Sequence, residues 1–177
     1  MKNNQIEEIF QSNGFTDYKF VNPQNDIILA HWVRFKCMFG CKGYGQCGSC
    51  PTSVPSVDEC HKMIREYKNA AILHFNYISQ TKEERHKMLE DILNLEREIF
   101  ITGYYKAFML PHHSCDFCEK CIAKGDRIAC VNKTKCRPTP EAMGIDIFQT
   151  VRNAGYTIEV LENKGDAMNR YSFILID

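Results

Sequence analysis

Cysteines concentrate in two short segments of this chain, and this clustering limits what those segments can fold into. Residues 37–50 hold four cysteines and residues 115–136 hold five. A chain of 177 residues buries roughly 70% of its unfolded surface, so it needs no disulfides to fold. The polar start and the absence of any apolar run near ~20 residues predict a cytoplasmic protein with no membrane segment. Because cytoplasmic thiols stay reduced, we expect these cysteines to bind metal or to catalyse a reaction.

The first segment is rich in glycine as well as cysteine. Its pattern is Cys37-x3-Cys41-x5-Cys47-x2-Cys50-Pro51, interrupted by four glycines. Glycines let a short loop turn sharply and aim several sulfurs at one centre, and backbone N–H groups there can hydrogen-bond to sulfur. The pattern predicts a four-thiol metal site made of Cys37, Cys41, Cys47 and Cys50.

The second segment contains a ferredoxin-like triplet, Cys115-x2-Cys118-x2-Cys121. In ferredoxins this triplet holds a [4Fe–4S] cluster, and the fourth ligand is supplied from elsewhere in the chain. Cys136, which precedes Arg137-Pro138, is the first candidate for that ligand, and Cys130 is the second. We therefore predict two [4Fe–4S] clusters. Zinc is less favoured, because zinc ribbons normally present two separated Cys-x2-Cys pairs.

The assignment of cysteines to clusters stays open at this point. In two-cluster ferredoxins the proline-associated cysteine binds the other cluster, so Cys50 and Cys136 could exchange places. Cys60 falls on the apolar stripe of a predicted helix and is expected to be a core thiol.

Histidines and basic residues surround the cysteine segments. His112 and His113 could contribute a ligand or hydrogen-bond to sulfur, although such pairs are more often solvated loop residues. The cations could form a solvated surface or a docking place for an anionic partner or substrate. These cations are Lys36, Lys42, Lys120, Lys124, Arg127, Lys133, Lys135 and Arg137.

Capping residues and apolar periodicity predict the helices. Ser56 with Glu59, and Thr81 with Glu84, form capping boxes in which the two residues satisfy each other's free backbone N–H groups. The predicted helices cover residues 4–12, 56–68, 81–102 and 146–154, with a further helix start at 139–141 that Gly144 could interrupt.

Alternating or continuous apolar runs predict the strands. They cover residues 27–37, 70–78, 104–110, 156–162 and 171–176, and the last two are expected to form a hairpin across residues 163–169. We find no internal repeat or linker. The expected fold is a single domain over residues 1–177, of the α/β or α+β class, in which a mixed sheet and helices form a layered sandwich with two cysteine-rich metal-binding loops.

Taken together, these motifs resemble a family of uncharacterised, predicted metal-binding proteins that carry a domain of unknown function and come from anaerobic bacteria and archaea. The resemblance runs from about Val33 to the C-terminus. It rests on the first segment with Gly43-Tyr44-Gly45, on the triplet, on Cys136-Arg137-Pro138 and on residues 141–146. In the family the position of Cys47 is often not cysteine, and Cys130 is not part of the pattern. The resemblance implies metal, most readily iron–sulfur, bound by Cys37, Cys41, Cys50, Cys115, Cys118, Cys121 and Cys136, and it implies no particular reaction.

Three functions remain after this reading. The first is electron transfer through two [4Fe–4S] clusters to a redox partner protein. The second is an enzyme whose open cluster iron acts as a Lewis acid on a small anionic or sulfur-containing substrate, with His112 or His113 as acid or base. The third is a zinc-stabilised interaction module. A formal net charge of zero disfavours nucleic acid, and no dinucleotide, Walker or Ser-His-Asp motif is present.

Overall fold

A four-stranded antiparallel sheet forms the centre of the computed structural model, which describes residues 3–77, 79–163 and 165–177. The strand order is β1-β2-β4-β3. The strands are β1 Tyr18–Val21, β2 Ala70–Tyr77, β3 Phe108–Leu110 and β4 Met168–Leu175. β2 and β4 occupy the middle and pair from Ala70↔Leu175 to Tyr77↔Met168.

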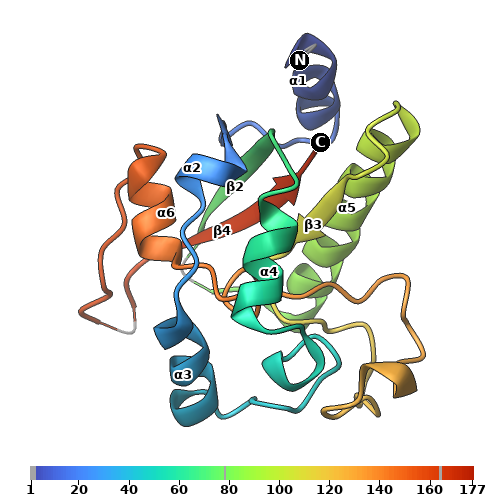
Figure 1. The fold of residues 1–177 in the computed structure, drawn as a ribbon, viewed down its shortest axis with the longest axis vertical. Coiled ribbons are helices and arrows are strands. Elements are labelled where there is room, and N and C mark those ends of the chain that lie inside the picture. The colour runs from blue at the N-terminus through green and yellow to red at the C-terminus, as the bar shows by residue number, and fades with distance from the viewer. Residues whose placement is uncertain (1–2, 78, 164) are drawn as a thin grey trace.

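Helices cover both faces of this sheet, as Figure 1 shows. Among the described residues the α-helices are α1 Asn3–Ser12, α2 Pro23–Asp26, α3 His31–Gly40, α4 Val57–Ile64, α5 Lys82–Ile101 and α6 Ile147–Asn153. α4 and α6 pack on one face, and α1 and α5 pack on the other. Successive residues of a strand point to opposite faces, so Ile72 joins the first core cluster and Leu73 joins the second. The predicted layered α/β or α+β sandwich is confirmed, but the described strands pair only in antiparallel fashion, so the expectation of a mixed sheet is wrong.

The capped helices form where the sequence predicts them. Both capping boxes are present, at the starts of α4 and α5. Asp146 caps α6 through a hydrogen bond from the backbone N–H of Gln149. α4 ends at Ile64, four residues before the predicted end. The helix start predicted at 139–141 is wrong, because those residues form a single turn in which the N–H of Met143 bonds to the carbonyl of Thr139.

The strand predicted over residues 27–37 is also wrong. Only an isolated bridge, Leu29↔Ile145, forms there, and residues 31–40 form helix α3. Within residues 33–37 only Val33 is buried, and Phe35 is 64% exposed, so the alternating pattern there provides no buried strand face. The helical conformation instead lets Arg34 donate hydrogen bonds to the carbonyls of Pro51, Pro55 and Ala142.

The predicted C-terminal hairpin does not form either. Residues 156–162 contain no strand, although β3 pairs with β4 only from Phe173 to Leu175 and leaves the first half of that edge unpaired. Of the apolar residues in that segment, Ile158 is buried whereas Val160 is 76% exposed. β3 is shorter than predicted, and the predicted end of β2, Ile78, lies outside the described residues. Within the described part of the chain, no helix has the length and apolar character needed to cross a membrane.

Gly144 holds the junction between the 139–143 turn and α6 in a conformation that other residues rarely adopt. Its φ is +88°, and a Cβ there would lie 3.0 Å from Cγ2 of the buried, β-branched Val57. We predict that Gly144→Ala lowers the free energy of unfolding by about 2–4 kcal/mol, measured by urea denaturation, because backbone strain and a rigid steric contact add. Gly14→Ala is the control, since it has a similar φ of +79° but open space around it. Equal losses in the two variants would contradict the steric part of this account.

Candidate metal centre

The first cysteine segment begins on α3 and continues into the loop that follows it. Cys37 lies in the last turns of α3, and Cys41 caps the helix. The Cys50 thiol donates to the carbonyl of Gly43 at 3.4 Å, and a Cβ on Gly43 would lie 3.8 Å from Cys41 Sγ. The Sγ atoms of Cys47 and Cys50 are 3.8 Å apart. The loop therefore brings Cys47 and Cys50 into contact, with Cys41 on the other side of Gly43.

The second cysteine segment folds into a small cluster of its own. The Cys136 thiol hydrogen-bonds to Cys115. Cys130 and Cys136 are buried together with Ala123, and Cys115 and Cys121 pack against them. Asn132 Nδ2 donates to Cys118 Sγ at 3.0 Å. The triplet and both candidates for its fourth ligand thus lie in one loop cluster.

The two cysteine segments meet at Ser49. Its Oγ lies 2.9 Å from Cys47 Sγ and accepts the backbone N–H of Cys115 at 3.4 Å. A Cβ on the neighbouring Gly48 would lie 3.1 Å from the Cβ of Ala123, so the two loops pack closely. Figure 1 shows the loop after α3 and the loop before α6 side by side, below α4.

Each contacting pair contains one thiol that ionises easily. A hydrogen bond from Cys50, together with those from Ser49, lowers the pKa of Cys47. A hydrogen bond from Cys136 likewise lowers the pKa of Cys115. The pKa values of Cys50 and Cys136 are raised because each donates to its partner. Since thiolates are the form that binds metals, Cys47 and Cys115 have the chemistry of metal ligands.

The thiols contact one another in two pairs, Cys47 with Cys50 and Cys115 with Cys136. Among the described residues, no three Cys, His, Asp or Glu side chains are arranged to hold a metal ion. The predicted ligand set, Cys37, Cys41, Cys47, Cys50, Cys115, Cys118, Cys121 and Cys136, therefore stays a prediction. The donor chemistry fits it, because the cysteines are free thiols and polar groups are placed beside two of the sulfurs.

Comparison with protein-family models places residues 21–176 in DUF2284, described as a predicted metal-binding protein. The chain belongs to this family. No curated protein and no solved structure matches it. The family match covers both cysteine segments, so the resemblance in the metal-binding motifs is confirmed at the level of the family.

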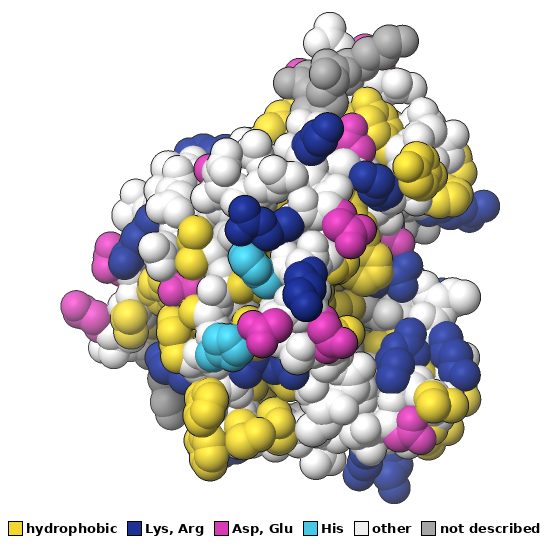
Figure 2. Space-filling model, in the orientation of Figure 1, with side chains coloured by type: hydrophobic (Ala, Val, Ile, Leu, Met, Phe, Trp, Pro, Cys, Tyr) yellow, Lys and Arg dark blue, Asp and Glu magenta, His cyan; other side chains and the backbone are white. Residues whose placement is uncertain are grey.

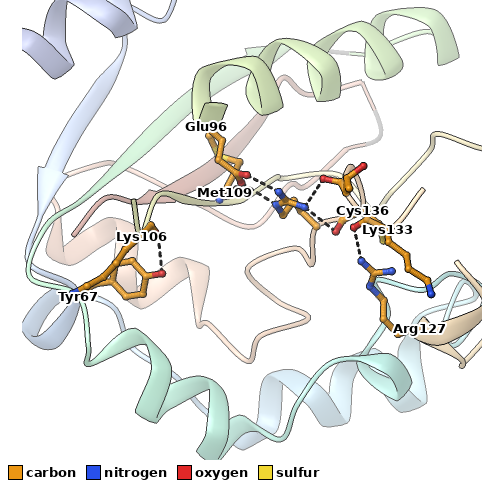
Figure 3. A network of polar contacts seen from close by, with 9 residues as sticks. Tyr67, Glu96, Lys106, Met109, Arg127, Lys133 and Cys136 are labelled. Atoms are coloured by element: carbon orange, nitrogen blue, oxygen red, sulfur yellow. Dashed lines mark hydrogen bonds and ion pairs between the residues drawn. The ribbon is translucent and has the colours of Figure 1, made fainter. Parts of the chain in front are cut away.

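A buried ion pair anchors the second cysteine loop of this DUF2284 member to the sheet. Arg137 donates from Nε to Glu96 Oε2 at 2.9 Å and from Nη2 to Glu96 Oε1 at 2.5 Å. Glu96 Oε2 also accepts the backbone N–H of Met109 at 2.7 Å, and Arg137 donates to the carbonyls of Thr134 and Cys136. Figure 3 shows this network between Glu96 on α5, Met109 on β3 and Cys136. One carboxylate therefore connects a helix, a strand and the cysteine loop.

The histidine pair is not a solvated loop feature. Nδ1 of His112 is hydrogen-bonded to the hydroxyl of Ser172 at 2.7 Å. Nε2 of His113 lies 2.8 Å from the hydroxyl of Tyr77 and 2.8 Å from the amide oxygen of Gln80. Burial lowers the pKa of His112 to about 3 and that of His113 to about 4, so both rings are neutral near pH 7. Among the described hydrogen bonds, neither ring contacts a cysteine sulfur.

The remaining candidates divide between the core and the surface. Cys60 is 1% exposed and belongs to the core cluster of α4, as predicted.

The basic residues near the second segment are partly compensated by acidic ones. Arg137 is neutralised by Glu96, and Lys135 lies 3.7 Å from Glu90. Figure 2 shows Lys and Arg side chains over the lower right of the molecule, and hydrophobic side chains over α3 at the lower left. On α3, Phe35, Met38 and Phe39 are all more than half exposed.

Three residues that position the cysteines were missed by the sequence reasoning. Ser49 lies inside the Cys47-x2-Cys50 motif, and Asn132 lies between Cys130 and Cys136, so their polar side chains among cysteines were a usable signal. Glu96 had no such signal, because it stands 41 positions from Arg137 and next to the buried Leu95.

Proposed function

We propose that this protein binds two [4Fe–4S] clusters and passes single electrons between a low-potential donor or acceptor and a redox partner protein. The observation that supports this proposal is the meeting of the two cysteine segments at Ser49. Two redox centres held by these segments would be neighbours, and short separation favours electron passage from one to the other. The clusters, when bound, would supply reversible one-electron chemistry.

The contacts of the protein suggest how its residues would hold such clusters. Cys47 and Cys115 would contribute the most readily formed thiolates. Asn132 and Ser49 would donate hydrogen bonds to sulfur, which is one of the features that sets the potential of an iron–sulfur centre. Cys47 lies close to Cys115. The packing is therefore compatible with clusters whose ligands come from both segments, and equally with one set of four cysteines from each segment.

Clustered cysteines that bind metal and form no disulfides suit a reducing compartment, so we place the protein in the cytoplasm in this proposal. An electron partner could approach the first segment directly, since Cys41 is exposed at the end of α3.

Anaerobic purification with iron, zinc and acid-labile sulfide measured together tests the proposal. We expect about eight iron atoms and about eight sulfides per chain, with visible absorption that dithionite bleaches reversibly. Protein that contains zinc in place of iron, or iron without sulfide, would overturn it.

A zinc-stabilised module is the second candidate, and one distance favours it. Four thiolates at the usual Zn–S distance of about 2.3 Å form a tetrahedron with edges of about 3.8 Å. Cys47 and Cys50 have this sulfur separation. The same metal analysis separates the two candidates, because a zinc site would give a colourless protein with zinc after either aerobic or anaerobic preparation.

A further inference from the structure

A cavity of about 790 Å³ lies beside the first cysteine segment. It is bounded by α3, the start of α6, residues 158–161 and the outer part of β4. β3 pairs with β4 only from Phe173 to Leu175, so β3 leaves this part of β4 unpaired on that side. The volume is typical of a site for a small organic molecule, and much of the wall is apolar, including Trp32, Phe148 and Ile158.

His112 contributes an unused hydrogen-bond donor to this cavity. The residue is 7% exposed and lines the cavity, and its Nε2 has no hydrogen-bond partner among the described residues. Ser172 Oγ accepts the backbone N–H of His112, so its own hydrogen is available to the Nδ1 of His112 at 2.7 Å. With Nδ1 as the acceptor, the neutral ring carries its proton on Nε2.

Arg170 contributes a second unused donor and a positive charge. It lies two residues before Ser172 on β4, so the two side chains leave the same face of the strand. Its Nε is buried and has no hydrogen-bond partner in the described part of the chain, and none of the ion pairs formed within that part includes Arg170. Its positive charge lies close enough to His112 to contribute to the lowered pKa of that ring, after burial and His113.

Two buried donors without partners destabilise a protein, because each has lost its hydrogen bonds to water and gained none in return. Such groups call for an explanation, and a ligand that accepts both hydrogen bonds would supply one. The ligand should be an anion, because Arg170 always carries its charge. A singly charged group is favoured over a phosphate dianion, since the carboxyl groups of Glu141, Asp146 and Glu159 also line the cavity.

We propose that this cavity binds an organic monocarboxylate. The carboxylate accepts hydrogen bonds from Arg170 Nε and His112 Nε2, and the apolar body of the ligand lies along the wall near Trp32. Because Cys37 and Cys41 also line the cavity, the ligand lies next to the first cysteine segment. The site uses no metal, so it does not depend on the proposed clusters.

Titration of the full chain, purified anaerobically, with octanoate tests this proposal. Trp32 is the only tryptophan of the chain and lines the cavity, so its fluorescence reports occupancy, and calorimetry gives an independent affinity. We expect saturable binding of octanoate and at least about tenfold weaker binding of octanol, which lacks the charge.

Variants connect this binding to the two donors. Arg170→Gln should weaken octanoate binding about tenfold or more, and His112→Phe, which keeps an aromatic ring against Phe75, should weaken it as well. Arg97→Gln is the matched control, because Arg97 is exposed on α5 and lies outside this cavity. Thermal melting confirms that each variant is folded.

Four results would overturn the proposal. The first is octanoate binding no tighter than octanol, and the second is unchanged affinity in a folded Arg170→Gln variant. The third is tighter binding of octyl phosphate than of octanoate, which would assign the site to phosphate esters. Absence of any binding at millimolar octanoate would also reject it, whatever the metal analysis shows.

Discussion

Replacing Glu96 with alanine is expected to lower the free energy of unfolding by about 3–5 kcal/mol, because the substitution leaves a nearly buried guanidinium without its counter-charge. The side chains of Glu96 and Arg137 are 12% and 17% exposed. The substitution also removes the acceptor of the Met109 N–H at the sheet. Urea denaturation, monitored by circular dichroism, measures the loss.

The surface ion pair of the same helix provides the control for this prediction. Lys87 and Asp91 lie 2.7 Å apart on α5, with the Lys87 side chain 75% exposed. Because water screens such a pair, Asp91→Ala should cost under about 1 kcal/mol. A loss for Glu96→Ala as small as that for Asp91→Ala would show that Arg137 finds another partner and that the ion pair does not anchor the loop.

Arg137 is also expected to affect the iron content of the protein. This effect distinguishes a role in positioning the cysteine loop from a role in the stability of the whole fold. Its guanidinium also binds the carbonyls of Thr134 and Cys136, so it positions the cysteine loop directly. If the proposed clusters form, the double variant Glu96→Gln/Arg137→Met should hold less iron than wild type even below its unfolding transition. Full iron content in this folded variant would limit the role of the pair to stability.

Substitution of Cys115 by serine is the second prediction with a large effect, and it rests on the proposed function. Cys115 contacts Cys136, and Ser49 connects it to the first segment. Loss of this thiolate should remove one of two clusters, so iron should fall from about eight to about four atoms per chain. Anaerobic iron and sulfide analysis with visible spectroscopy measures this change.

Two other cysteines serve as controls for that substitution. Cys60→Ala should keep the full iron content, because Cys60 lies in the core cluster of α4 and contacts Met143. Comparing Cys130→Ala with Cys136→Ala decides the fourth ligand, since both thiols are buried in the same cluster as the triplet. We expect Cys136→Ala to lose iron and Cys130→Ala to keep it. The reverse result would assign the ligand to Cys130, and unchanged iron in Cys115→Ser would refute the ligand role of the triplet.

Local patterns predicted most of the helices correctly, and the reason is physical. A capping box involves neighbouring residues, so Ser56 with Glu59 and Thr81 with Glu84 identify helix starts without reference to the rest of the fold. The apolar stripe of α5 can be buried against any apolar surface, so it predicts a helix without knowledge of the packing partner. In the structure β2, β3 and β4 provide that surface. The two capping boxes depend only on contacts between neighbouring residues, and the structure bears both of them out.

The wrong predictions share a different cause. Residues 27–37 and 156–162 have strand-like patterns, but a strand also needs a face that the rest of the fold buries. Residues 156–162 bury Ile158 and leave Val160 76% exposed, and they do not pair with the edge of β4 that β3 leaves free. Arg34 stabilises a helix in the other segment by bonding to carbonyls more than 15 positions away. Neither circumstance can be seen in a local pattern.

The sequence alone identified the candidate metal ligands of this protein, because the cysteines and their short spacings can be read directly along the chain. Two cysteine-rich loops, the capped helices and membership of a metal-binding family were all accessible from it. Only the tertiary structure decided which sulfurs meet, since Cys47 comes near Cys115 through the packing of two loops at Ser49. It also revealed Glu96 beneath Arg137, and the unpartnered donors of His112 and Arg170 in one cavity. Contacts of this kind arise between residues far apart in the chain, where spacing carries no information about distance.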